Sequence, residues 1–172
     1  MSKFTQEQLG QQLASMLALV STKFEKIHDK QGMPYVLHLL RVMGYLNTTD
    51  MELMMIGLGH DLVEDIKGFT YAELRRLIPN ERVIEGIRCM TKELGESYEE
   101  YQEKVLSNID SIRVKMADIK DNSDIHRLKG ISESDLARIT RYQLFYTRLK
   151  DRLIELTEEA NLRLHQPTGN AA

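Results

Sequence analysis

The chain has 172 residues, of which 42% are hydrophobic and 28% charged, and its formal net charge is −3. This length predicts one domain spanning residues 1–172, while the lack of a basic excess argues against a nucleic-acid or membrane-surface partner. A single cysteine, Cys89, excludes an internal disulfide and favours a cytoplasmic location.

Apolar residues recur at three- and four-residue steps along nearly the whole chain, which predicts an all-α fold of about seven to eight helices. A first helix is expected over about 5–29. Pro34 begins a second, over 34–46, because its missing N–H would be unpaired in a first turn anyway. Residues 47–50 interrupt the helical pattern and are expected to cap a third helix over 51–65.

The second half of the chain continues the helical pattern, with capping-box sequences at Thr70-x-x-Glu73 and Ser97-x-x-Glu100. The expected helices there cover about 70–79, 81–92, 97–108, 110–125 and 133–163. The last is the longest, and its apolar stripe is typical of a core face, although its length also allows packing in a homo-oligomer.

Residues with metal-ligand chemistry stand beside apolar helix faces at three places. His38 lies in YVLHLLRV, His60 and Asp61 begin HDLVED, and Asp118 lies in VKMADIKDNSD. Charged side chains rarely enter a core unless they are paired or bind a metal, and helical bundles build metal sites from inward-facing residues of different helices. Two imidazoles and two carboxylates suit Mn²⁺, Fe²⁺, Zn²⁺ or Co²⁺ better than Ca²⁺ or Mg²⁺. We interpret these residues as candidate ligands of one divalent ion.

Two more carboxylates, Glu64 and Asp65, follow these candidates by one helical turn. His60 and Glu64 are four residues apart, as are Asp61 and Asp65, so each pair would share a helix face. An acid or base there could orient a metal-activated water and carry its proton. Two alternatives stay open. A lone histidine on an apolar helix is commonly a hydrogen-bonded core residue, and Glu64 and Asp65 could instead solvate a helix end, although carboxylates at a C-terminus oppose the helix dipole.

Taken together, these segments resemble the HD-domain metal phosphohydrolases. The matching segments HDKQGMPYVLHLLRV, HDLVED and VKMADIKDN, in that order, are most similar to the RelA/SpoT-type alarmone hydrolases and their small stand-alone relatives. The similarity runs over about 10–155. It implies an HD-domain helical bundle that hydrolyses the 3′-pyrophosphate of ppGpp-type nucleotides.

The resemblance also implies roles for individual residues. It implies one Mn²⁺ held by His38, His60, Asp61 and Asp118, with Glu64 and Asp65 handling the attacking water. It places Lys115 beside the site, Asn122 near the nucleoside, and Tyr35 either at the substrate or in plain packing. His28 is expected in a structural role or at the substrate's edge.

The sequence departs from the family pattern in one respect that bears on the substrate. The basic loop before G-x-PY is shortened to HDKQ, which leaves mainly Lys30 and Arg41 to meet a pyrophosphate. Phosphate recognition usually relies on Lys and Arg. Alternatives to a ppGpp hydrolase are therefore an HD-type 5′-nucleotidase, a phosphodiesterase acting on another signalling nucleotide, a non-catalytic nucleotide-binding module and a purely structural interaction module.

Overall fold

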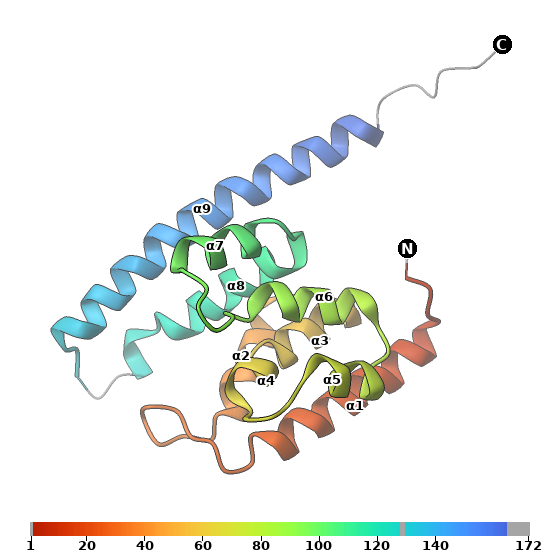
Figure 1. The fold of residues 1–172 in the computed structure, drawn as a ribbon. Coiled ribbons are helices and arrows are strands. Elements are labelled where there is room, and N and C mark those ends of the chain that lie inside the picture. The colour runs from red at the N-terminus through yellow and green to blue at the C-terminus, as the bar shows by residue number, and fades with distance from the viewer. Residues whose placement is uncertain (1, 128–129, 165–172) are drawn as a thin grey trace.

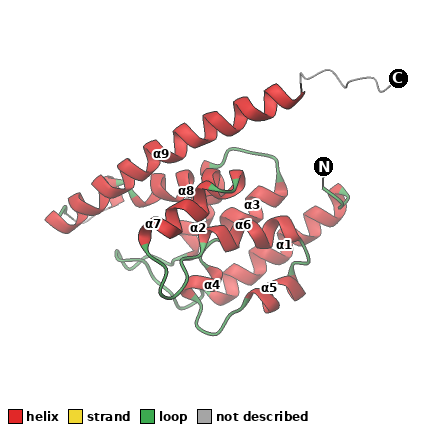
Figure 2. Ribbon diagram, turned by 45° about the horizontal axis from the view of Figure 1, so that its top comes forward, coloured by secondary structure: helices red, strands yellow, loops and turns green. Residues whose placement is uncertain are grey.

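The computed structural model describes residues 2–127 and 130–164. Within these residues the chain forms nine α-helices and one short 3-10 helix, and the only extended pairing is an isolated bridge between His28 and Pro34 (Figure 2). The helices are α1 (Gln6–Lys23), α2 (Val36–Tyr45), α3 (Met51–Gly59), α4 (Leu62–Asp65), α5 (Tyr71–Leu77), α6 (Glu81–Met90), α7 (Tyr98–Leu106), α8 (Ile109–Asn122), η1 (Ile125–Arg127) and α9 (Glu133–Leu164). The predicted all-α fold is confirmed.

The helix predicted over 51–65 is wrong as one element, because the chain forms α3 and α4 with a break at His60 and Asp61. The His60 imidazole lies 2.9 Å from the Gly57 carbonyl oxygen. In a continued helix that oxygen would be the acceptor for the Asp61 N–H. Both residues at the break keep right-handed helical dihedral angles, and the Asp65 N–H donates to the Asp61 carbonyl oxygen at 2.9 Å.

Other predicted ends are shifted by a few residues. The first helix ends at Lys23 rather than near 29, and the helix predicted over 110–125 ends at Asn122, with η1 following as a separate element. The long last helix, predicted over 133–163, is α9.

Helix α3 lies at the centre of the larger hydrophobic core and packs against α1, α2, α6 and α8 (Figure 1). Nearly all of its residues are buried. Gly86 of α6 allows close approach to α3, because a Cβ atom there would lie 2.5 Å from Cδ1 of Ile56. The C-terminal end of this buried helix delivers His60 and Asp61 to the edge of the core.

Helix α9 lies across α7 and α8 and extends well beyond them toward the C-terminus (Figure 1). Phe145 and Leu149 of its apolar stripe are buried in a second, smaller core with Tyr101, Val105 and Ile112. The stripe therefore serves as a core face along that part of α9. Among the described residues, none of the helices has both the length and the apolar character needed to cross a membrane.

Candidate metal centre

Three of the four predicted ligands form a compact buried cluster where α2, α3 and α8 meet. One ligand atom from each of His38, His60 and Asp118 lies within 4.8 Å of the other two. Asp118 Oδ1 is 3.3 Å from Nε2 of His38 and 3.7 Å from Nε2 of His60. Side chains far apart in the sequence thus converge on one point, as the ligand hypothesis requires.

Asp61, the fourth predicted ligand, lies beside the same two histidines. Its Oδ2 is 3.1 Å from Nε2 of His60 and 3.7 Å from Nε2 of His38. The same oxygen accepts a 2.7 Å hydrogen bond from the Tyr35 hydroxyl. This contact orients Asp61 toward the cluster.

The donor atoms of the cluster fit a divalent ion. Nε2 of His60 is buried and, among the residues that the structure describes, makes no hydrogen bond of good geometry, although Asp61 Oδ2 lies 3.1 Å away. Leaving such a group unsatisfied costs about 1–3 kcal/mol, which coordination of an ion would remove. Imidazole nitrogens together with carboxylate oxygens are the ligand set of borderline divalent metals.

Electrostatics keep the cluster's carboxylates ionised. Burial by itself would raise the pKa of Asp118, but the Lys115 ammonium, with Nζ 2.9 Å from Oδ2, and the two imidazoles hold that pKa well below its ordinary value. Burial likewise acts to lower the pKa of His60, yet the Asp61 and Asp118 carboxylates raise it well above its ordinary value. A metal ion would take the place of the protons on the imidazoles, because metal ligands bind in their deprotonated forms.

The two predicted proton handlers lie on α4, one turn beyond the cluster. Partial burial and the neighbouring Asp61 and Glu64 carboxylates raise the pKa of Asp65 to about 6, near the range in which proton transfer at neutral pH is efficient. Both residues lie at the molecular surface, and Glu64 accepts a 2.8 Å hydrogen bond from the Lys92 backbone N–H. Of the two, Asp65 has the environment better suited to moving a proton.

Several residues predicted to bind substrate donate hydrogen bonds to the cluster's carboxylates. Tyr35 donates to Asp61, Lys115 to Oδ2 of Asp118, and the Asn122 side-chain amide to Oδ1 of Asp118 at 2.6 Å. Any contact of these side chains with a substrate stays a prediction.

Arg41 and Asp121 form an ion pair beside His38. Arg41 Nε lies 2.5 Å from Asp121 Oδ1, and Asp121 Oδ2 lies 2.7 Å from His38 Nδ1. Sequence reasoning missed Asp121. The signal that could have found it is spacing, since Asp121 follows Asp118 by three residues just as Arg41 follows His38.

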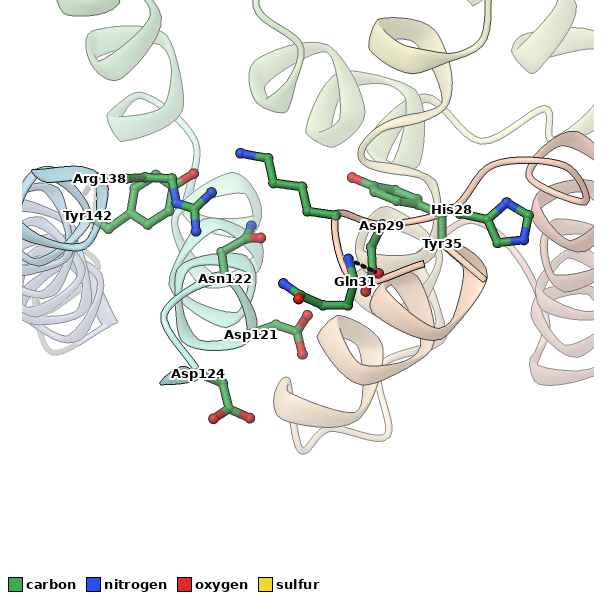
Figure 3. Close-up of a pocket in the computed structure, with 10 residues that line it drawn as sticks. His28, Asp29, Gln31, Tyr35, Asp121, Asn122, Asp124, Arg138 and Tyr142 are labelled. Atoms are coloured by element: carbon green, nitrogen blue, oxygen red, sulfur yellow. Dashed lines mark hydrogen bonds between the residues drawn. The ribbon is translucent and has the colours of Figure 1, made fainter. Parts of the chain in front are cut away.

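A cleft of about 340 Å³ lies next to the cluster. Its lining includes Tyr35 and Asn122, which donate hydrogen bonds to Asp61 and Asp118. Figure 3 shows Asp121 and Asn122 of α8 between the segment that carries His28 and Tyr35 on one side and Arg138 and Tyr142 of α9 on the other (Figure 3). The lining residues are His28, Asp29, Lys30, Gln31, Tyr35, Asp121, Asn122, Asp124, Arg138 and Tyr142.

Two of the cleft's lining residues were considered in the sequence analysis, and two others were not. Lys30 and His28 are exposed at its rim, and a contact of either with a substrate stays a prediction. Arg138 and Tyr142 were not among the predicted site residues. Tyr142 was overlooked because it belongs to the apolar stripe of the last helix. The packing of α9 against α8 brings both of them to the cleft.

Comparison with known proteins supports the fold. No family model matches the sequence. Among solved structures, the chain is similar to a metazoan ortholog of SpoT that hydrolyzes ppGpp and plays a role in starvation responses. The TM-score is 0.65 at 18% sequence identity, and the match covers 94% of this chain and 99% of that one. The chain therefore shares the helical fold of that protein over nearly its whole length.

Proposed function

We propose that this chain is a metal-dependent phosphohydrolase that acts on a nucleotide. The observation that carries the proposal is the buried cluster of His38, His60 and Asp118, in which Nε2 of His60 makes no hydrogen bond of good geometry within the described part of the chain. A cleft of nucleotide-compatible volume adjoins this cluster. The similarly folded SpoT ortholog, which hydrolyzes ppGpp, supports a nucleotide substrate.

The leading substrate is ppGpp, cleaved on its 3′ side. Hydrolysis would add one water across the bond between the 3′-oxygen and phosphorus, releasing pyrophosphate and leaving the 5′-diphosphate on the nucleoside. Lys30 and Arg138 are the cations that line the cleft and could contact phosphate, and Tyr35 and Tyr142 provide aromatic surface. A cytoplasmic location and homo-oligomer formation remain predictions.

His38, His60, Asp61 and Asp118 would hold the ion, with Mn²⁺ first and Fe²⁺, Co²⁺ or Zn²⁺ as alternatives. When bound, such an ion supplies Lewis-acid polarisation of a phosphoryl oxygen and makes water more acidic. Asp65 would accept a proton from water at the site, since its raised pKa favours proton uptake near neutral pH.

The charge of the cleft favours a second candidate within the same chemistry. Among the described residues, its lining includes the carboxylates of Asp29 and Asp124 against the cations Lys30 and Arg138, while a third carboxylate, Asp121, is paired with Arg41. Such a lining has no excess of cations to attract a highly phosphorylated nucleotide, because phosphate recognition usually relies on Lys and Arg. An HD-type 5′-nucleotidase or a phosphodiesterase, with a less charged substrate, fits this balance better.

A turnover screen tests the proposal. The purified protein is stripped of metal, reloaded separately with Mn²⁺, Fe²⁺, Co²⁺ or Zn²⁺, and offered ppGpp, pppGpp, nucleoside mono- and triphosphates and cyclic nucleotides, with products identified by mass. Pyrophosphate release from ppGpp would support the leading substrate, whereas orthophosphate or a ring-opened monophosphate would support the second candidate.

Matched variants connect the activity to the cluster. Asp118→Asn should lower turnover by about 100-fold or more, because it removes a ligand and not merely its support. Glu155→Gln on α9, which also removes one carboxylate but in an exposed surface ion pair, should leave turnover unchanged. Full activity in Asp118→Asn would refute the proposed site. Metal and nucleotide binding without turnover would identify a non-catalytic binding module.

A further inference from the structure

We infer that Asp121 is a positioning residue for the metal centre, which holds the His38 ring with Nδ1 protonated so that Nε2 faces the ion. The inference rests on the metal site proposed above and assigns a role to a residue that lies outside the expected ligand set. It follows from the contacts that the two ring nitrogens of His38 make with different carboxylates.

The two nitrogens of His38 face different carboxylates. Nδ1 lies 2.7 Å from Asp121 Oδ2, while Nε2 lies 3.3 Å from Asp118 Oδ1. An ionised carboxylate only accepts hydrogen bonds, so the short contact with Asp121 requires the proton to be on Nδ1. In the neutral ring this leaves the lone pair on Nε2, directed at the cluster.

The arrangement is built by two helices with matched spacing. His38 and Arg41 are three residues apart on α2, and Asp118 and Asp121 are three apart on α8, so each pair shares a helix face. The packing of α2 against α8 brings these two faces together. Asp118 then meets one nitrogen of His38, and Asp121 meets the other.

Arg41 stabilises the buried charge of Asp121. The Asp121 side chain is 0% exposed, and a carboxylate this deeply buried is costly unless it is paired. Arg41 supplies a two-point contact, with Nε 2.5 Å from Oδ1 and Nη2 3.2 Å from Oδ2. The negative charge behind His38 is thus retained without being left unpaired.

The second histidine offers an internal comparison. Nδ1 of His60 lies 2.9 Å from the Gly57 carbonyl oxygen, a neutral acceptor in the same helical turn. The orientation of His60 therefore depends on local backbone, whereas that of His38 depends on a charged side chain from another helix. Loss of Asp121 should release His38 and leave His60 in place.

The test measures metal affinity in Asp121→Ala and Asp121→Asn. Partners of this kind typically contribute about 10–100-fold to metal affinity. We expect Mn²⁺ to bind Asp121→Ala about 10–100-fold more weakly than wild type, and Asp121→Asn to show a smaller loss because an amide oxygen can still accept from Nδ1. The control is Glu155→Gln, which removes an exposed carboxylate paired with Arg152 on α9, away from the cluster and the cleft; its affinity should match that of wild type.

A spectroscopic readout separates positioning from simple loss of stability. In the Zn²⁺-loaded wild-type protein, which is diamagnetic, the ¹⁵N shifts of the His38 ring should show a protonated Nδ1 and an unprotonated Nε2. A proton on Nε2 would overturn the inference. If Asp121→Ala does not fold, Asp121→Asn, which has the same size, carries the affinity test.

The outcomes distinguish this inference from the function it rests on. Wild-type protein that binds no divalent ion would overturn the metal site and the role of Asp121 with it. If wild type binds Mn²⁺ and both Asp121 variants bind it with the same affinity to within about threefold, the role of Asp121 is overturned. The proposed metal site is then still supported.

Discussion

Arg82 of α6 joins carboxylates from two other parts of the fold, and replacing it by methionine tests how strongly this junction stabilises the protein. Its guanidinium donates to both oxygens of Asp110 at 2.8 and 2.9 Å, to Glu52 at 3.1 Å and to Asp50 at 2.7 Å. Asp50 and Glu52 lie at the start of α3, and Asp110 lies in the first turn of α8. The contact therefore links α6 to both of the helices that carry His60 and Asp118.

The expected cost follows from burial. The side chains of Glu52 and Asp110 are 6% and 8% exposed, so Arg82→Met leaves two buried carboxylates without this cation. Breaking a buried ion pair in this way costs about 3–5 kcal/mol. Because the Arg82 side chain is itself 39% exposed, we expect the lower end, about 3 kcal/mol, which for a chain of this length lowers Tm by about 6–12 °C.

Thermal unfolding monitored by circular dichroism measures the effect, with Arg75→Met as the matched control. Arg75 makes a similar two-point contact with Glu81, at 2.8 and 3.1 Å, but these side chains are 45% and 62% exposed. An exposed pair of this kind contributes little to stability, because solvent and salt screen it. A fall in Tm for Arg82→Met no larger than that for Arg75→Met would refute the reasoning.

The same junction predicts a dependence on pH. Burial alone would raise the pKa of Asp50, but Arg82 and the backbone N–H of Leu53 lower it below its ordinary value of 3.8. A lowered pKa means that the stabilisation is fully present above the unfolded-state value and is lost as pH falls through the folded-state value. Lowering the pH below 3.8, the ordinary pKa of Asp50, should therefore destabilise the wild type more steeply than Arg82→Met, as thermal unfolding at successive pH values would show.

Three further predictions concern the site and its supporting core. Burial and neighbouring carboxylates raise the pKa of Asp65 to about 6, so ionisation of Asp65 opposes folding as pH rises. In metal-stripped protein, the Tm of Asp65→Asn should therefore rise relative to the wild-type Tm between pH 4 and pH 8. A difference in Tm that stays constant over this range would contradict the prediction. Tyr35→Phe removes the 2.7 Å hydrogen bond to Asp61 and should weaken Mn²⁺ binding by about 10-fold with little change in KM, whereas a raised KM at unchanged metal affinity would point to substrate contact. Gly86→Val places a Cβ atom 2.5 Å from Cδ1 of Ile56 and should lower the free energy of unfolding, measured by chemical denaturation, by about 1–3 kcal/mol. Adding Ile56→Ala should recover part of that loss. Strictly additive effects of the two substitutions on the free energy of unfolding would exclude the clash.

The sequence by itself determined the helices and the chemistry that they carry. Helical periodicity and capping are local properties, which is why Ser97 and Glu100 form the predicted capping box. The second predicted box forms only in part, because Thr70 accepts from the Glu73 N–H but the Glu73 carboxylate pairs with Lys23. Residue type similarly limits metal chemistry, because few side chains besides histidine and carboxylates bind divalent ions at such positions. The order of His38 and the HDLVED segment in the chain was therefore enough to suggest the cluster.

Only the tertiary structure decided which side chains meet. The periodicity of residues 51–65 does not reveal that the chain breaks at His60, where an imidazole and a backbone carbonyl interact. The contact of Asp121 with His38, and the arrival of Arg138 at the cleft, depend on how α2, α8 and α9 pack against one another. Packing is directed mainly by burial of apolar surface, which is non-directional. Local sequence therefore specifies each helix and its apolar face, but the pairing of polar side chains between helices is fixed only when the assembled core sets their distance and crossing.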